Sequence, residues 1–224
     1  MDTSAKKQIN LDFNTLPLKT KKALVFLSEQ SWIGKSGWYL AGGTALALQA
    51  GHRKSVDLDF FTAQKEFNNQ ELLNNFLGNN GWKITINKKN TIYGELFGAK
   101  ISFIAYPFFI PKQKFIQYGS IKILQSLDIA IMKIIAISQR GRKRDFFDLF
   151  WCVRNIKPLE KLLKKLKIQY PLVAHDYHHI LKSLIYFNDA ENDPSPEIFF
   201  KAEWKEVKNF FRREIKNISK QLLK

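Results

Sequence analysis

The chain has 224 residues, of which 45% are hydrophobic, so it can bury a core as one large domain or two small ones. A formal net charge of +16 favours contact with polyanions such as RNA or DNA, although an AT-rich coding bias also produces lysine-rich chains. A single cysteine excludes an internal disulfide, and the absence of a signal peptide or a long apolar run predicts a cytoplasmic protein that does not span a membrane.

The first half of the chain has the pattern of a sheet with covering helices. Apolar residues at helical spacing predict a helix over residues 16–32, and a turn at 33–37 leads to a short strand over 38–41. A helix over 45–50 and a second strand over 56–61 follow. The remaining elements expected in this half are a helix over 69–77 and strands over 82–87, 91–97, 99–106 and 119–124.

The second half of the chain is predicted to be helical. Strands that come first and helices that come later indicate an α+β fold. We expect an α/β core over residues 1–122 and a helical domain over 123–224 that packs against it, since no flexible linker separates them. The predicted helices cover 126–138, 144–154, 158–168, 174–187 and 198–223.

Two aspartates, Asp57 and Asp59, interrupt the second predicted strand. Residues two apart in a strand point to the same face and lie roughly 6.5 Å apart. Val56, Leu58 and Phe60 would then point the other way, into the core. Two like charges on a half-buried strand need a cation or hydrogen bonds to offset their repulsion. Mg²⁺ suits the pair, because it prefers carboxylate oxygens together with substrate phosphates.

A glycine-rich turn precedes these acids. Gly42 and Gly43 allow a ligand to approach the backbone closely. Thr44 stands at the start of a predicted helix, where the free N–H groups of the helix attract phosphate. Thr44 could instead be only a helix cap, and either short motif alone occurs by chance. The combination on adjacent strands, with Asp57 thirteen positions after Thr44, indicates nucleoside triphosphate chemistry.

A second group of charged residues lies between positions 126 and 150. Lys133 stands on an otherwise apolar helix face, and a buried lysine is costly unless it is paired or meets an anion. Arg140 and Arg144 could neutralise a triphosphate, while Asp145 and Asp148, three apart, fall on one side of the next helix. An aspartate here could orient Lys133 or accept a proton, or Lys133 and Asp148 could form a purely structural ion pair.

The two regions together resemble the AbiEii/AbiGii toxin family of the nucleotidyltransferase superfamily. The first region, LAGGTAL…RKSVDLDFF, is similar to the superfamily signature GG[ST] followed by D-h-D. The second is similar to D-h-x-x-x-K followed by R-x-x-x-R/K-D-x-x-D. Its matching residues here are Asp128, Lys133, Arg140, Arg144, Asp145 and Asp148.

This resemblance, which covers residues 38–150, implies a nucleotidyltransferase-like mixed sheet with flanking helices. It also implies transfer of a nucleoside monophosphate from an NTP to an acceptor, plausibly RNA such as a tRNA end, by a toxin that a separate antitoxin protein counteracts. Asp57 and Asp59 would hold Mg²⁺ and, with Lys133 and Asp148, would form the catalytic group. The nucleotide or its phosphates would contact Gly42, Gly43, Thr44, Ser55, Arg140, Arg144 and Asp145.

The chain departs from the superfamily pattern at one position. Many relatives carry a third carboxylate on a neighbouring strand, where this chain has Ser102, although Glu95 could substitute for it. With two carboxylates, one metal ion is a simpler expectation than a two-metal mechanism. The alternatives are a nucleotide- or RNA-binding module without catalysis and a phosphotransferase of the same fold. We expect a monomer.

Overall fold

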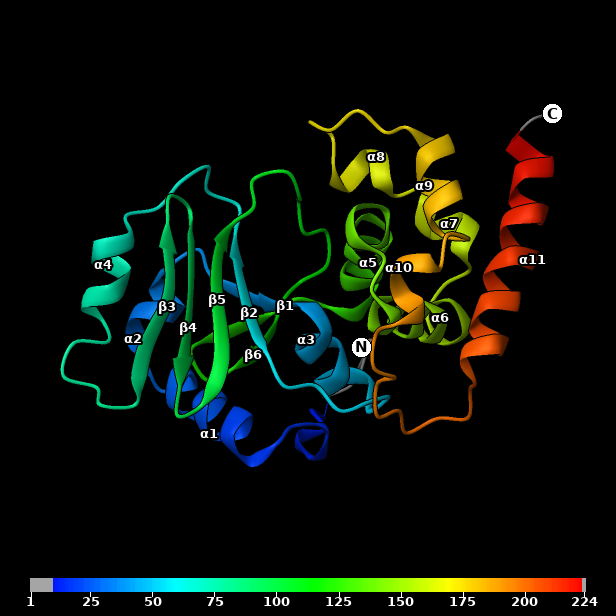
Figure 1. Ribbon diagram of the computed structural model, residues 1–224. Helices are drawn as coiled ribbons and strands as arrows, with labels where there is room; N and C mark the ends of the chain where they lie inside the picture. Colours follow the sequence, from blue (N-terminus) through cyan, green and yellow to red (C-terminus); the bar gives the residue numbers. More distant parts are fainter. Residues whose placement is uncertain (1–9, 223–224) are drawn as a thin grey trace, which may run out of the picture.

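A computed structural model describes residues 10–222, and its centre is a seven-stranded mixed sheet (Figure 1). The strand order is β3-β4-β5-β2-β1-β7-β6, in which β2 runs parallel to β5 and β1 parallel to β7. All other neighbouring strands are antiparallel. The strands are β1 (Tyr39–Ala41), β2 (Leu58–Thr62), β3 (Trp82–Lys88), β4 (Thr91–Leu96), β5 (Ala99–Ala105), β6 (Ile116–Tyr118) and β7 (Ile121–Ile123).

Helices flank this sheet and make up most of the C-terminal part. Figure 1 shows α5 to α11 gathered on the side of the molecule away from β3 and α4, with α3 between them and the strands. The mixed sheet with these helices confirms the predicted fold class. The helices are η1 (Phe13–Thr15), α1 (Leu18–Ser28), α2 (Ser31–Lys35), α3 (Gly42–Ala50), α4 (Asn69–Asn74), α5 (Ser126–Arg140), α6 (Lys143–Asn155), α7 (Leu159–Leu163), α8 (Leu166–Gln169), α9 (Tyr177–Ser183), α10 (Asn188–Glu191) and α11 (Trp204–Leu222).

The order of the elements follows the sequence prediction, but several boundaries differ. The single helix expected over 16–32 is two helices, because Gln30 has an extended backbone, and α2 covers most of the expected turn at 33–37. The strand expected over 119–124 is the second half of a hairpin, in which Gly119 has a positive φ of 55° between β6 and β7. The boundary expected at residue 122 falls inside β7, and one hydrophobic core runs through both parts of the chain.

The last helix also begins later than the predicted residue 198, because of a long-range contact that sequence periodicity cannot reveal. Ile198 forms a β-bridge with Arg53, and the Phe199 N–H donates to the His52 carbonyl at 2.8 Å. The Lys54 N–H donates to the Glu197 carbonyl at 2.9 Å. This segment is therefore extended, and it fixes the loop that leads into β2.

One face of the sheet packs an aromatic core. Phe103 lies at its centre, with ring centroids 5.2 Å from both Phe60 and Trp38. Leu58 and Phe60 are buried as expected, but the expectation for Val56 is wrong. Val56 is 42% exposed, because β2 begins only at Leu58 and Val56 lies in the preceding loop.

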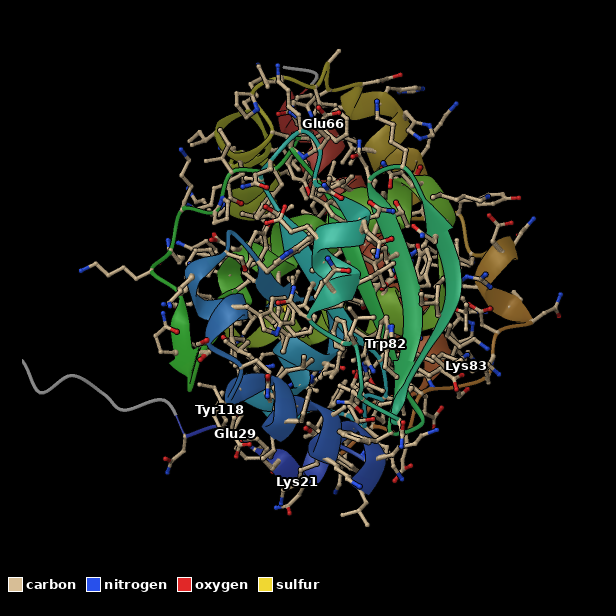
Figure 2. All side chains as sticks on the ribbon, turned by 90° about the vertical axis from the view of Figure 1, so that its left-hand side faces the viewer. Lys21, Glu29, Glu66, Trp82, Lys83 and Tyr118 are labelled. Atoms are coloured by element: carbon tan, nitrogen blue, oxygen red, sulfur yellow. The ribbon has the colours of Figure 1, made fainter. Side chains whose placement is uncertain are left out.

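The edge strand β3 separates this core from solvent. Figure 2 looks onto this end of the molecule, where Trp82 and Lys83 are labelled. Successive strand residues point to opposite faces, so Trp82 stacks on Phe76, 4.2 Å between centroids, while Lys83 lies on the other face. No helix among the described residues is long and apolar enough to cross a membrane.

Candidate active site

The sheet face opposite the aromatic core carries its side chains in rows that strand register fixes. Asp59 in β2 lies beside Ser102 in β5, and this pair forms a catalytic row. Two residues further along β2, Phe61 lies beside its partners in the neighbouring strands and forms an aromatic row, with Tyr39 and Ile104. In the opposite direction, Lys100 lies beside Glu95 and forms a charged row. The rows therefore change from apolar to charged along the strands.

A cavity of about 680 Å³ lies over these rows. Helix α5 forms its other wall, with residues at spacings of three and four that place them on one helix face. The side chains on this face change along the helix from apolar to charged in the same sense as the rows. They are Ile129, Met132, Lys133, Ala136, Gln139 and Arg140.

The carboxylate pair, Asp57 and Asp59, lines this cavity, although Asp57 lies in the loop just before β2 and not on the strand as predicted. Asp59 accepts a hydrogen bond from the Ser102 hydroxyl at 2.8 Å. Burial raises the pKa of the Asp59 carboxyl, the charge of Asp57 adds to this effect, and the bond from Ser102 opposes it. Asp57 keeps 28% of its side chain exposed and lies 3.4 Å from the Arg144 guanidinium. The pair therefore has few protein partners.

The two glycines make room for side chains of the site. Gly42 has a positive φ of 70°, and a Cβ atom there would lie 2.8 Å from Asp59 Oδ2. A Cβ atom on Gly43 would lie 2.2 Å from Arg53 Nη2. Both glycines also line the cavity. The space beside them, which was predicted to admit a ligand, is occupied by the side chains of an acid and an arginine.

Thr44 and Ser55 hold the loop before β2 in place. The Thr44 hydroxyl is buried, interacts with the Asp57 carbonyl oxygen and lies 2.9 Å from the Ser55 hydroxyl. Ser55 lines the cavity, whereas Thr44 does not appear among its lining residues. Thr44 is thus placed to position Asp57, and Ser55 is the hydroxyl of the two that a ligand can reach.

Behind the cavity lies a buried group of charges, which we call the Asp148 cluster. Asp148 is fully buried, and each of its oxygens accepts two hydrogen bonds or ion pairs. Oδ1 contacts His52 at 2.7 Å and Arg53 Nε at 2.6 Å, while Oδ2 contacts Arg53 Nη2 at 2.9 Å and Lys133 at 2.6 Å. Burial alone would raise the pKa of Asp148, but these partners, Arg53 first, hold it well below the ordinary value. The other members of the cluster are His52, Arg53, Lys133 and Asp145.

Lys133 connects this cluster to the cavity. Its ammonium group lies 2.5 Å from Asp145 Oδ1, and Arg140 contacts the other Asp145 oxygen at 3.3 Å. Burial would lower the pKa of Lys133, but Asp145 and Asp148 raise it above the ordinary value, so the lysine is charged. Lys133 is thus paired, as the structural alternative requires, and although buried it lines the cavity, as a phosphate-binding role requires.

The residues present fit one divalent cation. Among residues 10–219, no group of three or more His, Cys, Asp or Glu side chains could hold a metal ion. Glu95 lines the same cavity but lies in the charged row, away from the carboxylate pair. Asp57 and Asp59 can supply two ligands to a Mg²⁺ ion that takes its remaining ligands from water and phosphate.

Several functional residues were missed by sequence reasoning. Arg53 and His52 complete the Asp148 cluster from more than ninety positions away in the chain. Arg53 opens the quoted RKSVDLDFF block, whereas His52 lies just before it and had no signal. Tyr106 and Tyr170 line the apolar end of the cavity, and no motif marks either.

Known proteins resemble this chain in sequence. The family model described as nucleotidyl transferase AbiEii toxin, type IV TA system, matches residues 33–123 and 99–220. An uncharacterized protein of Aquifex aeolicus (strain VF5) is 39% identical over 186 residues, which cover 80% of this chain and 86% of that protein.

Two solved structures share the fold. MenT4, a nucleotidyltransferase toxin from Mycobacterium tuberculosis, superimposes with a TM-score of 0.53 at 14% identity, over 91% of this chain and 86% of that one. A protein from H. pylori assigned as a nucleotidyltransferase gives a TM-score of 0.51 at 17% identity, over 91% and 96% of the two chains.

Proposed function

The chain belongs to the AbiEii family of nucleotidyltransferase toxins of type IV toxin–antitoxin systems, and we propose that it transfers a nucleoside monophosphate from an NTP to RNA with the help of Mg²⁺. The observation that carries this proposal is the cavity in which the carboxylate pair faces Lys133, Arg140 and Arg144. In this cavity, acidic side chains that can hold a cation meet basic side chains that can hold phosphate, and they come from β2, α5 and α6.

In the proposed reaction, a hydroxyl group of the acceptor attacks the α-phosphorus. A new O–P bond forms, the bond from the α-phosphorus to the bridging oxygen breaks, and pyrophosphate leaves with the electron pair. The hydroxyl proton is lost to water. A Mg²⁺ ion held by Asp57 and Asp59 would neutralise phosphate charge and fix the position of the triphosphate.

The basic residues stabilise the charge that develops during this transfer. Lys133 presents a fixed ammonium group, because Asp145 and Asp148 hold it from behind. Arg140 and Arg144 have about half of their side chains exposed and can move toward the β- and γ-phosphates. Asp148 positions Lys133 and does not act as a base, since its oxygens are buried and fully used.

The acceptor is proposed to be RNA, plausibly the end of a tRNA. The net charge of +16 attracts polyanions, and the exposed Lys100, Arg140 and Arg144 stand at the charged end of the cavity. The family description implies an antitoxin protein as a further partner. NTPs, Mg²⁺ and tRNA meet in the cytoplasm, where we place the activity of a monomeric chain.

Positionally labelled NTPs test this proposal. The protein is incubated with total tRNA, Mg²⁺ and each of the four NTPs, labelled either at the α- or at the γ-phosphate. The proposal expects α-label, and no γ-label, on the RNA, and no transfer by Asp57→Ala. Label from the γ-phosphate would instead select a phosphotransferase. RNA that is retained on the protein without any label, with or without Mg²⁺, would select a binding module.

A further inference from the structure

Three tyrosines from separate elements lie close together at the apolar end of the cavity, and two of them line it. We call them the tyrosine cluster. Tyr39 lies in β1, Tyr106 follows β5, and Tyr170 follows α8. The rings of Tyr106 and Tyr170 lie 6.2 Å apart and nearly perpendicular, and both line the cavity. Tyr39 lies behind Phe61, its register partner in the aromatic row. Burial raises the pKa of all three phenols, so each hydroxyl keeps its proton.

Two of these hydroxyl groups are buried without a partner. The side chains of Tyr39 and Tyr170 are 2% and 1% exposed, and within the described part of the chain neither hydroxyl oxygen has a hydrogen bond. The Tyr106 hydroxyl is close enough to raise the pKa of Tyr170, yet the pair lacks hydrogen-bond geometry. Burying an unpaired hydroxyl costs folding free energy, so such groups call for an explanation.

The cavity lining beside Tyr106 and Tyr170 is apolar, although the charge of the buried Asp128 acts on Tyr39. Phe61 and Ile104 in the aromatic row face Ile129 and Met132 at the start of α5. The nearest buried acid, Asp128, is already used by the backbone N–H groups of 112 and 113, at 2.8 and 2.9 Å, and by the Gln169 amide. Apolar walls with neutral hydroxyl groups suit an uncharged aromatic ring that has hydrogen-bonding atoms on its edge.

We propose that this end of the cavity binds the nucleobase of the NTP and that the Tyr170 hydroxyl contacts the edge of the base. The inference rests on the proposed function, because it takes the carboxylate pair as the triphosphate site. The aromatic row lies one two-residue step, roughly 6.5 Å, beyond the catalytic row, which leaves room for a ribose between phosphate and base. The acceptor approaches from the charged row at the other end.

Replacement of Tyr170 by phenylalanine tests the proposal, since it removes the hydroxyl and keeps the ring. Calorimetric titrations with Mg²⁺ measure the dissociation constants of the four NTPs and of inorganic tripolyphosphate. We expect Tyr170→Phe to weaken the tightest-bound NTP by about five- to tenfold and to leave tripolyphosphate binding unchanged. We also expect its Tm without nucleotide to be unchanged or higher, because the lost hydroxyl has no partner.

Tyr186→Phe is the control, because Tyr186 is exposed and lies outside the cavity lining. It should change neither the preference among NTPs nor the Tm. Tyr106→Phe is the second cluster variant and should also weaken the NTP more than tripolyphosphate.

Three results would overturn the base subsite and leave the proposed function standing. The first is equal binding of the four NTPs and tripolyphosphate by the wild type. The second is a loss of Tm in Tyr170→Phe together with equal weakening of NTP and tripolyphosphate binding. The third is weakened RNA binding by Tyr170→Phe with unchanged NTP binding. Failure of the wild type to bind tripolyphosphate with Mg²⁺ would overturn the phosphate site itself, and the base subsite with it.

Discussion

The Asp148 cluster and the carboxylate pair differ in how many partners their acidic side chains have. Asp148 is fully buried and its two oxygens receive four contacts from His52, Arg53 and Lys133. Asp57 is partly exposed and meets one arginine at 3.4 Å, while Asp59 accepts one hydrogen bond, from Ser102.

This difference indicates a division of roles. A buried charge with a full set of partners cannot take a new ligand without losing an old one, so it serves to fix the positions of other groups. A pair of neighbouring acids with few partners repel each other and gain free energy when a cation binds. We therefore propose that the Asp148 cluster positions other groups and that the carboxylate pair takes part in the chemistry, and each prediction below tests that proposal.

The largest effect is expected for Asp148→Ala. This change leaves Arg53 and Lys133 as buried charges without their shared partner, which should lower the free energy of unfolding by about 3–5 kcal/mol. Urea denaturation followed by circular dichroism measures it. Asp57→Ala is the control and should keep or slightly raise the stability. Equal stability losses in the two variants would remove the distinction between the two regions.

A large effect on catalysis, without a loss of stability, is expected for Asp59→Asn. The amide keeps the size of the side chain and cannot supply a charged ligand, so NMP transfer should fall by about 100- to 1000-fold. Transfer of α-label to RNA at saturating NTP measures this, and the denaturation midpoint should not fall. A variant that keeps more than a tenth of the activity would show that Asp59 is dispensable.

Acid should unfold the protein through the Asp148 cluster. The folded-state pKa values of Asp145 and Asp148 lie below the ordinary value of 3.8, because Lys133 lies beside Asp145, and Arg53 and Lys133 lie beside Asp148. Their stabilisation is therefore complete above that value and is lost as the pH falls through the lowered pKa values. Denaturation curves at a series of acidic pH values should show a shallower pH dependence for Asp148→Ala. An unchanged slope would mean that other carboxyl groups dominate acid unfolding.

The smallest effect is expected for Arg144→Ala. Arg144 is about half exposed and its contact with Asp57 is long, so the contact itself contributes little to stability. Loss of one charge near the phosphates should lower kcat/KM for the NTP by roughly tenfold. Steady-state kinetics with Lys201→Ala as a control, an exposed lysine outside the cavity lining, would separate a local role from the effect of net charge. Equal losses in both variants would contradict a local role.

The acids and bases of the candidate site could be predicted from the sequence, but their separate roles could not. Spacing alone placed Asp57 and Asp59 on one side of a strand, and the single lysine on an apolar helix face pointed to Lys133. The partners of Asp148 could not be predicted, since Arg53 and Asp148 are 95 positions apart and only the packing of α6 against the loop before β2 brings them together. The extended segment around Ile198 depends on another long-range contact, a β-bridge to Arg53 in the same loop.

The tyrosine cluster was missed for a similar reason. Its three members come from β1, the end of β5 and the end of α8, and each one alone resembles an ordinary core tyrosine. Thr44 shows the opposite case, in which a residue was predicted from a motif but its contacts were not. Its motif was recognised, but only coordinates show that its hydroxyl is used by Asp57 and Ser55 and is buried away from the cavity.

Titration of Mn²⁺, followed by electron paramagnetic resonance in the presence of an NTP analogue that cannot transfer its α-phosphate, tests the central claim most directly. The account predicts one tightly bound ion per wild-type chain, its loss in Asp59→Asn, and its retention in Glu95→Gln, which alters an acid in the same cavity outside the carboxylate pair. Metal binding that survives in Asp59→Asn, or that disappears equally in Glu95→Gln, would contradict it.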